Sequence, residues 1–241
     1  MKYIFLVIIS VFCFASCVNS NSRKDHSIYW QKNSAEYYAL CIQAYNIAKF
    51  RLDKALISTS DKPLAIVADI DETVLNNLPY NEMLIQTGQS FTQNTWSEWV
   101  NKKEATAIPG ALDFFNYVED QGVEIIYLSN RKIENYEPTK LNLISAGFPF
   151  DDKTIMLLRD KEGNKESRRK QLTSYNIVLF LGDNLSDFNE RFYRESNESR
   201  TKGVNSLRQM FGNKYILFPN LIYGTWEMGF ENYIVKRFQR N

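Results

Sequence analysis

Two hydrophobic patterns alternate along the chain. Short, continuous apolar runs are separated by longer stretches in which apolar residues recur every three or four positions. The continuous runs, which are typical of buried parallel strands, cover residues 64–68, 124–128, 155–158, 177–181 and 215–218. The helical spacing is clearest in residues 111–120 and 165–172. This alternation predicts an α/β fold, a mostly parallel sheet with helices on both faces, whose ligands bind beyond the carboxyl ends of the strands.

Two segments depart from the alternation. Residues 34–57 carry one long helical stripe, which we interpret as core packing, and the polar residues 60–63 end it. Residues 76–108 are polar but contain several aromatic side chains. We therefore predict an N-terminal helical segment over residues 34–60 and a core over residues 61–241, with a cap inserted at about residues 76–108.

The first residues have the features of an export signal. Lys2 precedes an apolar run over residues 3–15, which is too short to span a bilayer, and Cys17 follows small residues. This ending resembles the bacterial lipobox, although Phe14 stands where Leu is usual. We expect a signal peptide over residues 1–16, lipidation of Cys17, and a polar tether over residues 17–33 that anchors the protein to the outer membrane or cell surface. An ordinary secretory signal with a coincidental Cys17 is the alternative, and both predict export.

The charge balance and the rarer residues exclude other classes. The 241 residues include 29 Lys and Arg against 28 Asp and Glu, so a net charge of +1 does not favour a nucleic-acid polymer as partner. The single His26 lies in the predicted tether, which excludes enzymes with a histidine nucleophile. Cys13 would leave with the signal and Cys41 is isolated, so we predict no disulfide framework.

Polar residues follow three of the predicted strands. Asp69 and Asp71 come directly after the first run, and alternation along the chain turns both side chains the same way. Two carboxylates this close require a cation or a proton. A hydroxyl, an amide and two further carboxylates follow later runs, and oxygen ligands of this kind suit Mg²⁺. The residues added by the later strands are Ser129, Asn130, Asp183 and Asp187.

With these motifs the sequence resembles the haloacid-dehalogenase-like (HAD) superfamily. Its phosphatases share an Asp-x-Asp-x-Thr signature, a Ser or Thr after the second strand, a Lys, and a final acidic pair. Residues 66–80 and 181–188 look like the two signatures of the bacterial class C acid phosphatases, a family that includes outer-membrane lipoproteins acting as 5′-nucleotidases. The resemblance implies a HAD-like Rossmannoid fold whose small helical cap is formed by the N-terminal helix and the insertion.

The resemblance also implies a role for each residue. Asp69 would be the nucleophile and Asp71 the general acid and base, while Ser129 and Asn130 would bind phosphate. Mg²⁺ would be held by Asp69, Asp183 and the backbone carbonyl of Asp71. Asp187 would act on the metal through a water or orient the phosphate-binding lysine.

The lysine and the substrate slot are further expectations. Lys165 matches the family's Lys-x-x-Arg pattern and opens a predicted helix, so we favour it over Lys161 as the phosphate-binding cation. Phe91, Trp96 and Tyr223 lie outside the periodic segments. By resemblance they line a slot for a nucleobase or aromatic leaving group, and cap packing is the alternative.

The sequence therefore predicts a Mg²⁺-dependent acid phosphatase that acts on phosphate monoesters, with 5′-nucleotides and aryl phosphates as substrates and an aspartyl-phosphate intermediate. Two alternatives stay open: a broad-specificity phosphatase or phosphotransferase of the same superfamily, and a surface lipoprotein that binds haem or nucleotides without turnover. The presence of all four acidic positions argues against the second alternative. The resemblance also implies a possible homodimer.

Overall fold

The computed structural model describes residues 20–230. The predicted signal peptide and the predicted lipidation site, Cys17, lie outside the described residues.

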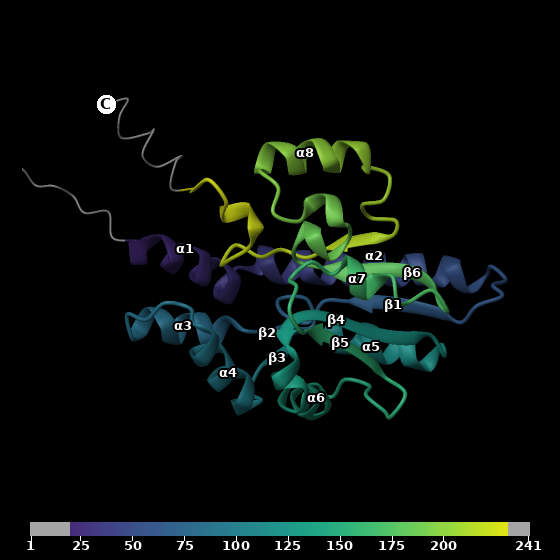
Figure 1. Cartoon of the computed structure of the whole chain (residues 1–241), viewed down its shortest axis with the longest axis horizontal. Helices are drawn as coiled ribbons and strands as arrows, with labels where there is room; N and C mark the ends of the chain where they lie inside the picture. Colours follow the sequence, from purple (N-terminus) through teal and green to yellow (C-terminus); the bar gives the residue numbers. More distant parts are fainter. Residues whose placement is uncertain (1–19, 231–241) are drawn as a thin grey trace, which may run out of the picture.

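A five-stranded parallel sheet forms the centre of the molecule, with the strand order β5-β4-β1-β6-β7 (Figure 1). The strands are β1 (Leu64–Ala68), β4 (Glu124–Lys132), β5 (Ile155–Arg159), β6 (Asn176–Gly182) and β7 (Tyr215–Leu217). All five predicted strands are present, and the predicted α/β class is confirmed. Ala68, the last residue of β1, pairs with Tyr127 on one side and Leu181 on the other, so the chain segments that follow these positions leave the sheet at one edge.

Strand β4 is longer than the sequence predicts. The apolar run ends at Leu128, but the strand continues to Lys132, which pairs with Arg159 of β5 after a register shift. Residues predicted to follow the strand, Ser129 and Asn130, therefore belong to it. Alternation within the strand fixes which of their side chains face inward, a constraint that a loop would not impose.

Most of the core lies on one face of the sheet. There α2 (Ala35–Leu56) and α5 (Ala111–Asp120) pack against Ile66 and Ala68 of β1. The alternate residues of β1, Ala65 and Val67, face a smaller cluster around Leu172 near the short helix α7 (Glu166–Arg169). Helix α2 lies within the predicted helical segment of residues 34–60, and its stripe packs into the main core as predicted.

The predicted polar tether is wrong over most of its length. Residues from Ser20 to Asn33 form helix α1, which packs against helix α3 of the cap. Its buried Ile28 joins a small cluster with Leu78 and Ile222, and the side chain of Gln31 is buried as well. Sequence pattern missed this helix because too few of its residues are apolar to produce a stripe.

The predicted cap insertion is present as two helices, α3 (Leu78–Gln86) and α4 (Gln93–Lys102). A two-stranded antiparallel pair, β2 (Leu75–Asn76) with β3 (Thr106–Ala107), joins the two ends of the insertion. The Thr92 side chain accepts a hydrogen bond from the Thr95 backbone N–H and so begins α4. Helix α1 lies beside this pair of helices at one end of the molecule (Figure 1).

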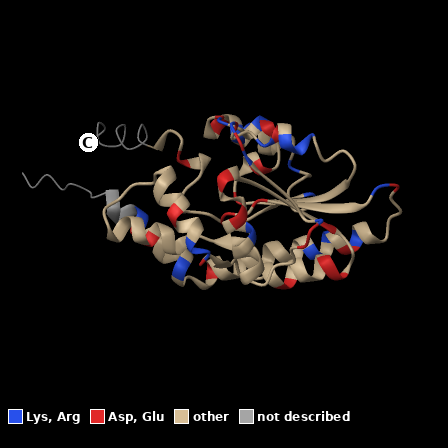
Figure 2. Cartoon of the chain, turned by 60° about the horizontal axis from the view of Figure 1, so that its bottom comes forward, with Lys and Arg blue, Asp and Glu red and all other residues tan. Residues whose placement is uncertain are grey.

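The remaining elements complete the surface. They are α6 (Tyr136–Ser145), α8 (Asn197–Ser206), η1 (Ile133–Asn135), η2 (Leu185–Asp187), η3 (Glu190–Phe192) and η4 (Thr225–Glu227). Acidic and basic residues are interspersed over the ribbon, and neither sign takes over one side (Figure 2). No helix within residues 20–230 has the length and apolar character needed to cross a membrane.

Candidate active site

A cavity of about 680 Å³ lies at the carboxyl edge of the sheet, between the strand ends and the cap. It collects nearly all of the residues that the sequence singles out, from segments more than 150 positions apart. The predicted site residues that line it are Asp69, Asp71, Phe91, Trp96, Asn130, Lys165, Asp183, Asp187 and Tyr223. Ser129 is not among the lining residues, and its side chain is fully buried.

Three carboxylates and one ammonium group form the centre of the cavity. Oxygens of Asp69, Asp183 and Asp187 lie within 4.8 Å of one another. Lys165 donates a hydrogen bond to Asp69 and another, of 2.7 Å, to Oδ1 of Asp187. One cation against three largely buried carboxylates leaves an excess of negative charge at the cavity floor, so this donor set fits a hard divalent cation.

Burial and the closeness of the like charges also shift the pKa values of this cluster. Burial raises the pKa of Asp69 to about 7, because the neighbouring carboxylates add to the desolvation and Lys165 only partly offsets it. Burial and the charges of Asp187 and Asp69 also raise the pKa of Asp183. For Lys165, burial favours the neutral amine, but Asp187 and Asp69 outweigh it and the pKa is raised. The lysine is therefore a fixed positive charge.

Close packing after β6 places Asp187. Its Oδ2 accepts a 2.9 Å hydrogen bond from the backbone N–H of Asn184, and this bond caps the start of the short helix η2. A Cβ atom on residue 182 would lie only 2.5 Å from the Cβ of Asp187, so only glycine fits at position 182 without a shift of Asp187. Asp183 is oriented separately, because the side chain of Asn220 donates a 2.7 Å bond to its Oδ2.

Asp71 lies apart from the carboxylate cluster. Its side chain is paired with Arg131 at 2.8 Å and also accepts a 2.9 Å hydrogen bond from Asn77. The carboxylate of Asp71 therefore does not join the three that could hold a metal, and the backbone carbonyl is the only part of Asp71 that the predicted metal role can use.

The predicted phosphate ligands divide into two kinds. Asn130 lines the cavity, and its Oδ1 accepts a 2.6 Å bond from Arg168, the arginine of the Lys-x-x-Arg pattern. The hydroxyl of Ser129 accepts a 3.1 Å hydrogen bond from the backbone N–H of Arg131, so it stabilises the backbone at this end of β4. Lys165 is buried, whereas Lys161 is exposed and does not line the cavity. Helix α7 covers only four residues, and the side chain of Lys165 rather than the helix end carries the positive charge.

Aromatic side chains form another part of the cavity wall. The rings of Phe91 and Trp96 lie 6.3 Å apart, and Tyr80 packs on Trp96 with centroids 5.0 Å apart. Phe91 is 61% exposed, whereas Trp96 is 9% exposed, so Trp96 serves cap packing and cavity wall together. Tyr223 also lines the cavity, and its hydroxyl donates a 3.3 Å hydrogen bond to Oε1 of Glu72, a buried carboxyl.

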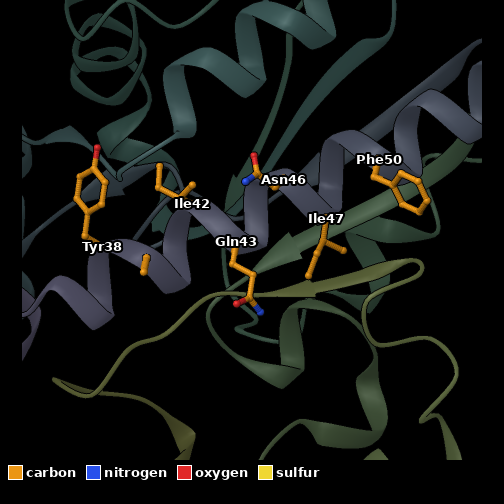
Figure 3. A pocket seen from close by; sticks show the side chains of 7 residues that line it. Tyr38, Ile42, Gln43, Asn46, Ile47 and Phe50 are labelled. Atoms are coloured by element: carbon orange, nitrogen blue, oxygen red, sulfur yellow. The ribbon is translucent and has the colours of Figure 1, made fainter.

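A second hollow lies along the outer side of α2 and has a different character. Tyr38, Ile42, Ile47 and Phe50 line it together with two amides (Figure 3). None of its lining side chains is a carboxylate or a cation. It therefore offers no groups for metal binding or phosphoryl chemistry.

Comparison with known proteins agrees with this geometry. A family model described as HAD superfamily, subfamily IIIB (acid phosphatase), matches residues 13–226. The chain belongs to this family. Two structures of the class C acid phosphatase from Bacillus anthracis, one with tungstate bound, are similar to it at 41% and 40% identity, each with a TM-score of 0.83. The alignments cover 89% and 88% of this chain and 90% of each of those chains.

More distant relatives cover only part of their own length. The Stem 31 kDa glycoprotein of Glycine max is 34% identical over 127 residues, which is 49% of this chain and 49% of the relative. Acid phosphatase 1 of Solanum lycopersicum is 30% identical over 128 residues, or 50% of each. The chain thus spans about half the length of these relatives. The predicted resemblance to the HAD acid phosphatases is confirmed by the family model and the Bacillus structures.

Several polar residues that surround the HAD signature aspartates were not singled out by sequence reasoning. Each is buried and hydrogen-bonds a predicted site residue, except Trp99, which bonds Asn77, and in the sequence each looks like ordinary strand, loop or helix. They are Glu72, Asn77, Trp99, Arg131, Arg168 and Asn220. Two signals were present in the sequence: Arg131 directly follows the predicted phosphate-binding pair, and Arg168 is the arginine of the Lys-x-x-Arg pattern.

Proposed function

We propose that this protein is a Mg²⁺-dependent acid phosphatase that hydrolyses phosphate monoesters through an aspartyl-phosphate on Asp69. The observation that carries the proposal is the grouping of Asp69, Asp183 and Asp187 around Lys165 inside one cavity. Membership of the HAD acid phosphatase family supports it.

The side chains can divide the reaction between them. Asp69 attacks phosphorus and the P–O bond to the leaving group breaks, while Lys165 balances the charge of the transferring group. Asp71 gives its proton to the departing oxygen and later takes one from the water that hydrolyses the aspartyl-phosphate. Mg²⁺, held by Asp69, Asp183 and the carbonyl of Asp71, would neutralise negative charge on the carboxylates and the phosphoryl oxygens.

The cavity wall favours substrates with an aromatic part, such as 5′-nucleotides and aryl phosphates. Phe91, Trp96 and Tyr223 offer faces on which a base or ring can stack beside the reacting centre. The tungstate bound by the Bacillus enzyme is an oxyanion, which supports an anion-binding centre in this family.

Phosphate release by the purified protein tests the proposal. The enzyme is stripped with a chelator, then assayed with and without added Mg²⁺ on nucleoside 5′-monophosphates, nitrophenyl phosphate and glycerol phosphate. We expect turnover only with the metal, and a higher kcat/KM for the aromatic substrates. Turnover that ignores the metal, or no turnover of any ester, would contradict it. Added alcohols report phosphotransferase activity in the same assay.

We also propose that the protein is exported and anchored by a lipid on Cys17 to the outer membrane or cell surface. The support is the apolar segment and the lipobox-like residues before Cys17. A homodimer is a separate proposal, which light scattering of the purified protein can test.

A further inference from the structure

We propose that Arg131 and Asn77 are positioning residues that set the orientation of the Asp71 carboxyl group, and that Trp99 of the cap holds Asn77 in place. This inference rests on the proposed phosphatase function, in which Asp71 is the general acid and base.

The two oxygens of Asp71 have unequal surroundings. Oδ1 accepts three hydrogen bonds, from Arg131 Nη2 at 2.8 Å, Arg131 Nε at 3.0 Å and Asn77 Nδ2 at 2.9 Å. Oδ2 has one longer contact, 3.3 Å from Arg131 Nε. Because Oδ1 is occupied by three donors, Oδ2 is the oxygen that can carry a proton to a leaving group in the cavity.

Arg131 is itself rigidly held. Its side chain has no exposed surface, its Nη1 donates a 3.1 Å bond to the hydroxyl of Thr139, and its guanidinium lies 5.6 Å from the centre of the Trp96 ring. A planar guanidinium fixed on several sides transmits its orientation to the carboxylate that it binds.

Asn77 links the same carboxylate to the cap. It is fully buried, and its Oδ1 accepts a 2.9 Å bond from the indole N–H of Trp99 in α4. An indole nitrogen can only donate, so the Asn77 oxygen must face Trp99 and the amide NH₂ must face Asp71. The orientation of this amide is therefore fixed by chemistry, and the chain Trp99–Asn77–Asp71 runs from the cap to the proposed acid.

A purely structural role is the competing interpretation of these contacts, but the burial is asymmetric. The side chain of Asp71 keeps 17% of its surface exposed and lines the cavity, whereas that of Arg131 is completely buried. Burying the arginine is costly, and two of its donors, Nη2 and Nε, bond Oδ1 of a carboxylate that faces the cavity. This is the arrangement expected of a positioning residue.

Leaving-group dependence distinguishes positioning from stability. We would measure kcat/KM, which includes every step up to leaving-group departure, for nitrophenyl, phenyl and alkyl phosphates in the wild type, Trp99→Phe and Arg131→Lys. Trp99→Phe removes the N–H and leaves a smaller ring. Arg131→Lys keeps the positive charge but loses the planar pair of N–H donors that bonds Asp71. Tyr117→Phe is the matched control, because it removes an O–H donor that bonds Asp53 of α2 while Tyr117 does not line the cavity.

We expect both variants to lose about 10- to 100-fold on alkyl phosphates and less than about 3-fold on nitrophenyl phosphate, since a poor leaving group depends on a well-placed acid. The control should keep the wild-type pattern. Equal losses on every ester, or no loss, would overturn the inference, and unfolding curves of both variants show which of them is folded.

Asp71→Asn separates this result from failure of the proposed function. If Asp71→Asn shows the selective loss and the two variants do not, Asp71 is the acid but its neighbours do not position it. If Asp71→Asn loses all esters equally, the acid role itself is wrong and the inference falls with it. A wild type without phosphatase activity would contradict the proposed function directly.

Discussion

Three carboxyl groups within four residues are handled in three different ways. Asp69 is paired with Lys165, Asp71 with Arg131, and Glu72 with the neutral amide of Gln31 at 2.7 Å. The structure thus gives a separate partner to each charge that the signature brings together. This separation suits the proposed roles of Asp69 as nucleophile and Asp71 as acid, with Glu72 as a structural anchor.

We predict that Asp69→Asn abolishes turnover and leaves the fold intact. The change removes the attacking carboxylate but keeps its size, so the loss should be at least about 10³-fold in kcat. Asp61→Asn, an exposed site before the start of β1, is the matched control and should keep wild-type activity. Steady-state rates and thermal unfolding are measured side by side. Activity above contaminant level in folded Asp69→Asn would contradict the nucleophile assignment.

Glu72 makes stability depend on pH. Burial, together with the charge of Asp71, raises the pKa of Glu72 from 4.5 to about 7. The folded state therefore prefers the protonated acid, so its contribution is fully present below pH 4.5 and is lost as pH rises through 7.

Glu72→Gln should remove this dependence. Relative to the variant, the unfolding free energy of the wild type should fall by up to about 3 kcal/mol across that window. Urea unfolding at fixed Mg²⁺, repeated from acid to neutral pH, measures the difference between the two proteins. Altered hydrogen bonding to Gln31 adds only a constant offset, so two parallel curves would show that Glu72 does not titrate in this range.

The sequence points to the proposed catalytic and metal-binding residues more readily than to the residues that hold them in place. Asp69 and Asp183 follow apolar runs directly, and their position after a strand is visible in one dimension. Arg131 and Asn77 meet Asp71 from 60 and 6 positions away, and only the folded backbone makes them neighbours. Pattern alone also cannot tell that the Ser129 hydroxyl accepts a bond from the Arg131 backbone, and its predicted role as a phosphate ligand stays a prediction.

At the scale of elements, strands were predictable because a short, continuous apolar run bounded by polar residues is typical of a strand buried on both faces. The ends of the strands were harder to predict. Strand β4 runs four residues beyond its apolar run, because its pairing with β5 extends to the polar residue Lys132. Helix α1 was missed because its burial depends on Ile28 and Gln31 meeting partners elsewhere in the chain. Tertiary contacts decided these cases over local pattern.

The junction of β6 with η2 leads to a prediction at this scale. A Cβ at position 182 would lie 2.5 Å from Cβ and 2.6 Å from Oδ2 of Asp187, so Gly182→Ala must displace that carboxylate. We expect the Mg²⁺ concentration for half-maximal activity to rise about 10-fold or more.

Gly212→Ala provides the control. Gly212 has a φ of +74° and open space around its Cβ position, so its substitution should lower stability by about 1 kcal/mol without changing the Mg²⁺ dependence. Metal titrations of both variants, with unfolding curves, test this. An unchanged titration for Gly182→Ala would mean that Asp187 does not contribute to the metal site.

For the whole molecule, the two ends of the described chain contribute to one region. Helix α1 packs on the cap, its Ile28 contacts Ile222 near the far end, and Gln31 reaches Glu72 beside the proposed active site. The first described residues are therefore part of the cavity's support. A lipid at Cys17 would place that support only a few residues from the membrane surface.

The three cysteines allow the proposed anchor to be tested cleanly. A thioether to lipid requires the thiol of Cys17, so Cys17→Ser should abolish incorporation of a labelled fatty acid in the expressing bacterium. Cys13→Ser, within the predicted signal, and Cys41→Ser, at a buried position of α2, should both keep the label. Incorporation is a better readout than membrane association, because an uncleaved apolar segment could also retain the protein at the membrane. An unlabelled wild type, or a Cys17→Ser protein labelled as strongly as wild type, would show that the lipobox interpretation is wrong and that Phe14 marks an ordinary secretory signal.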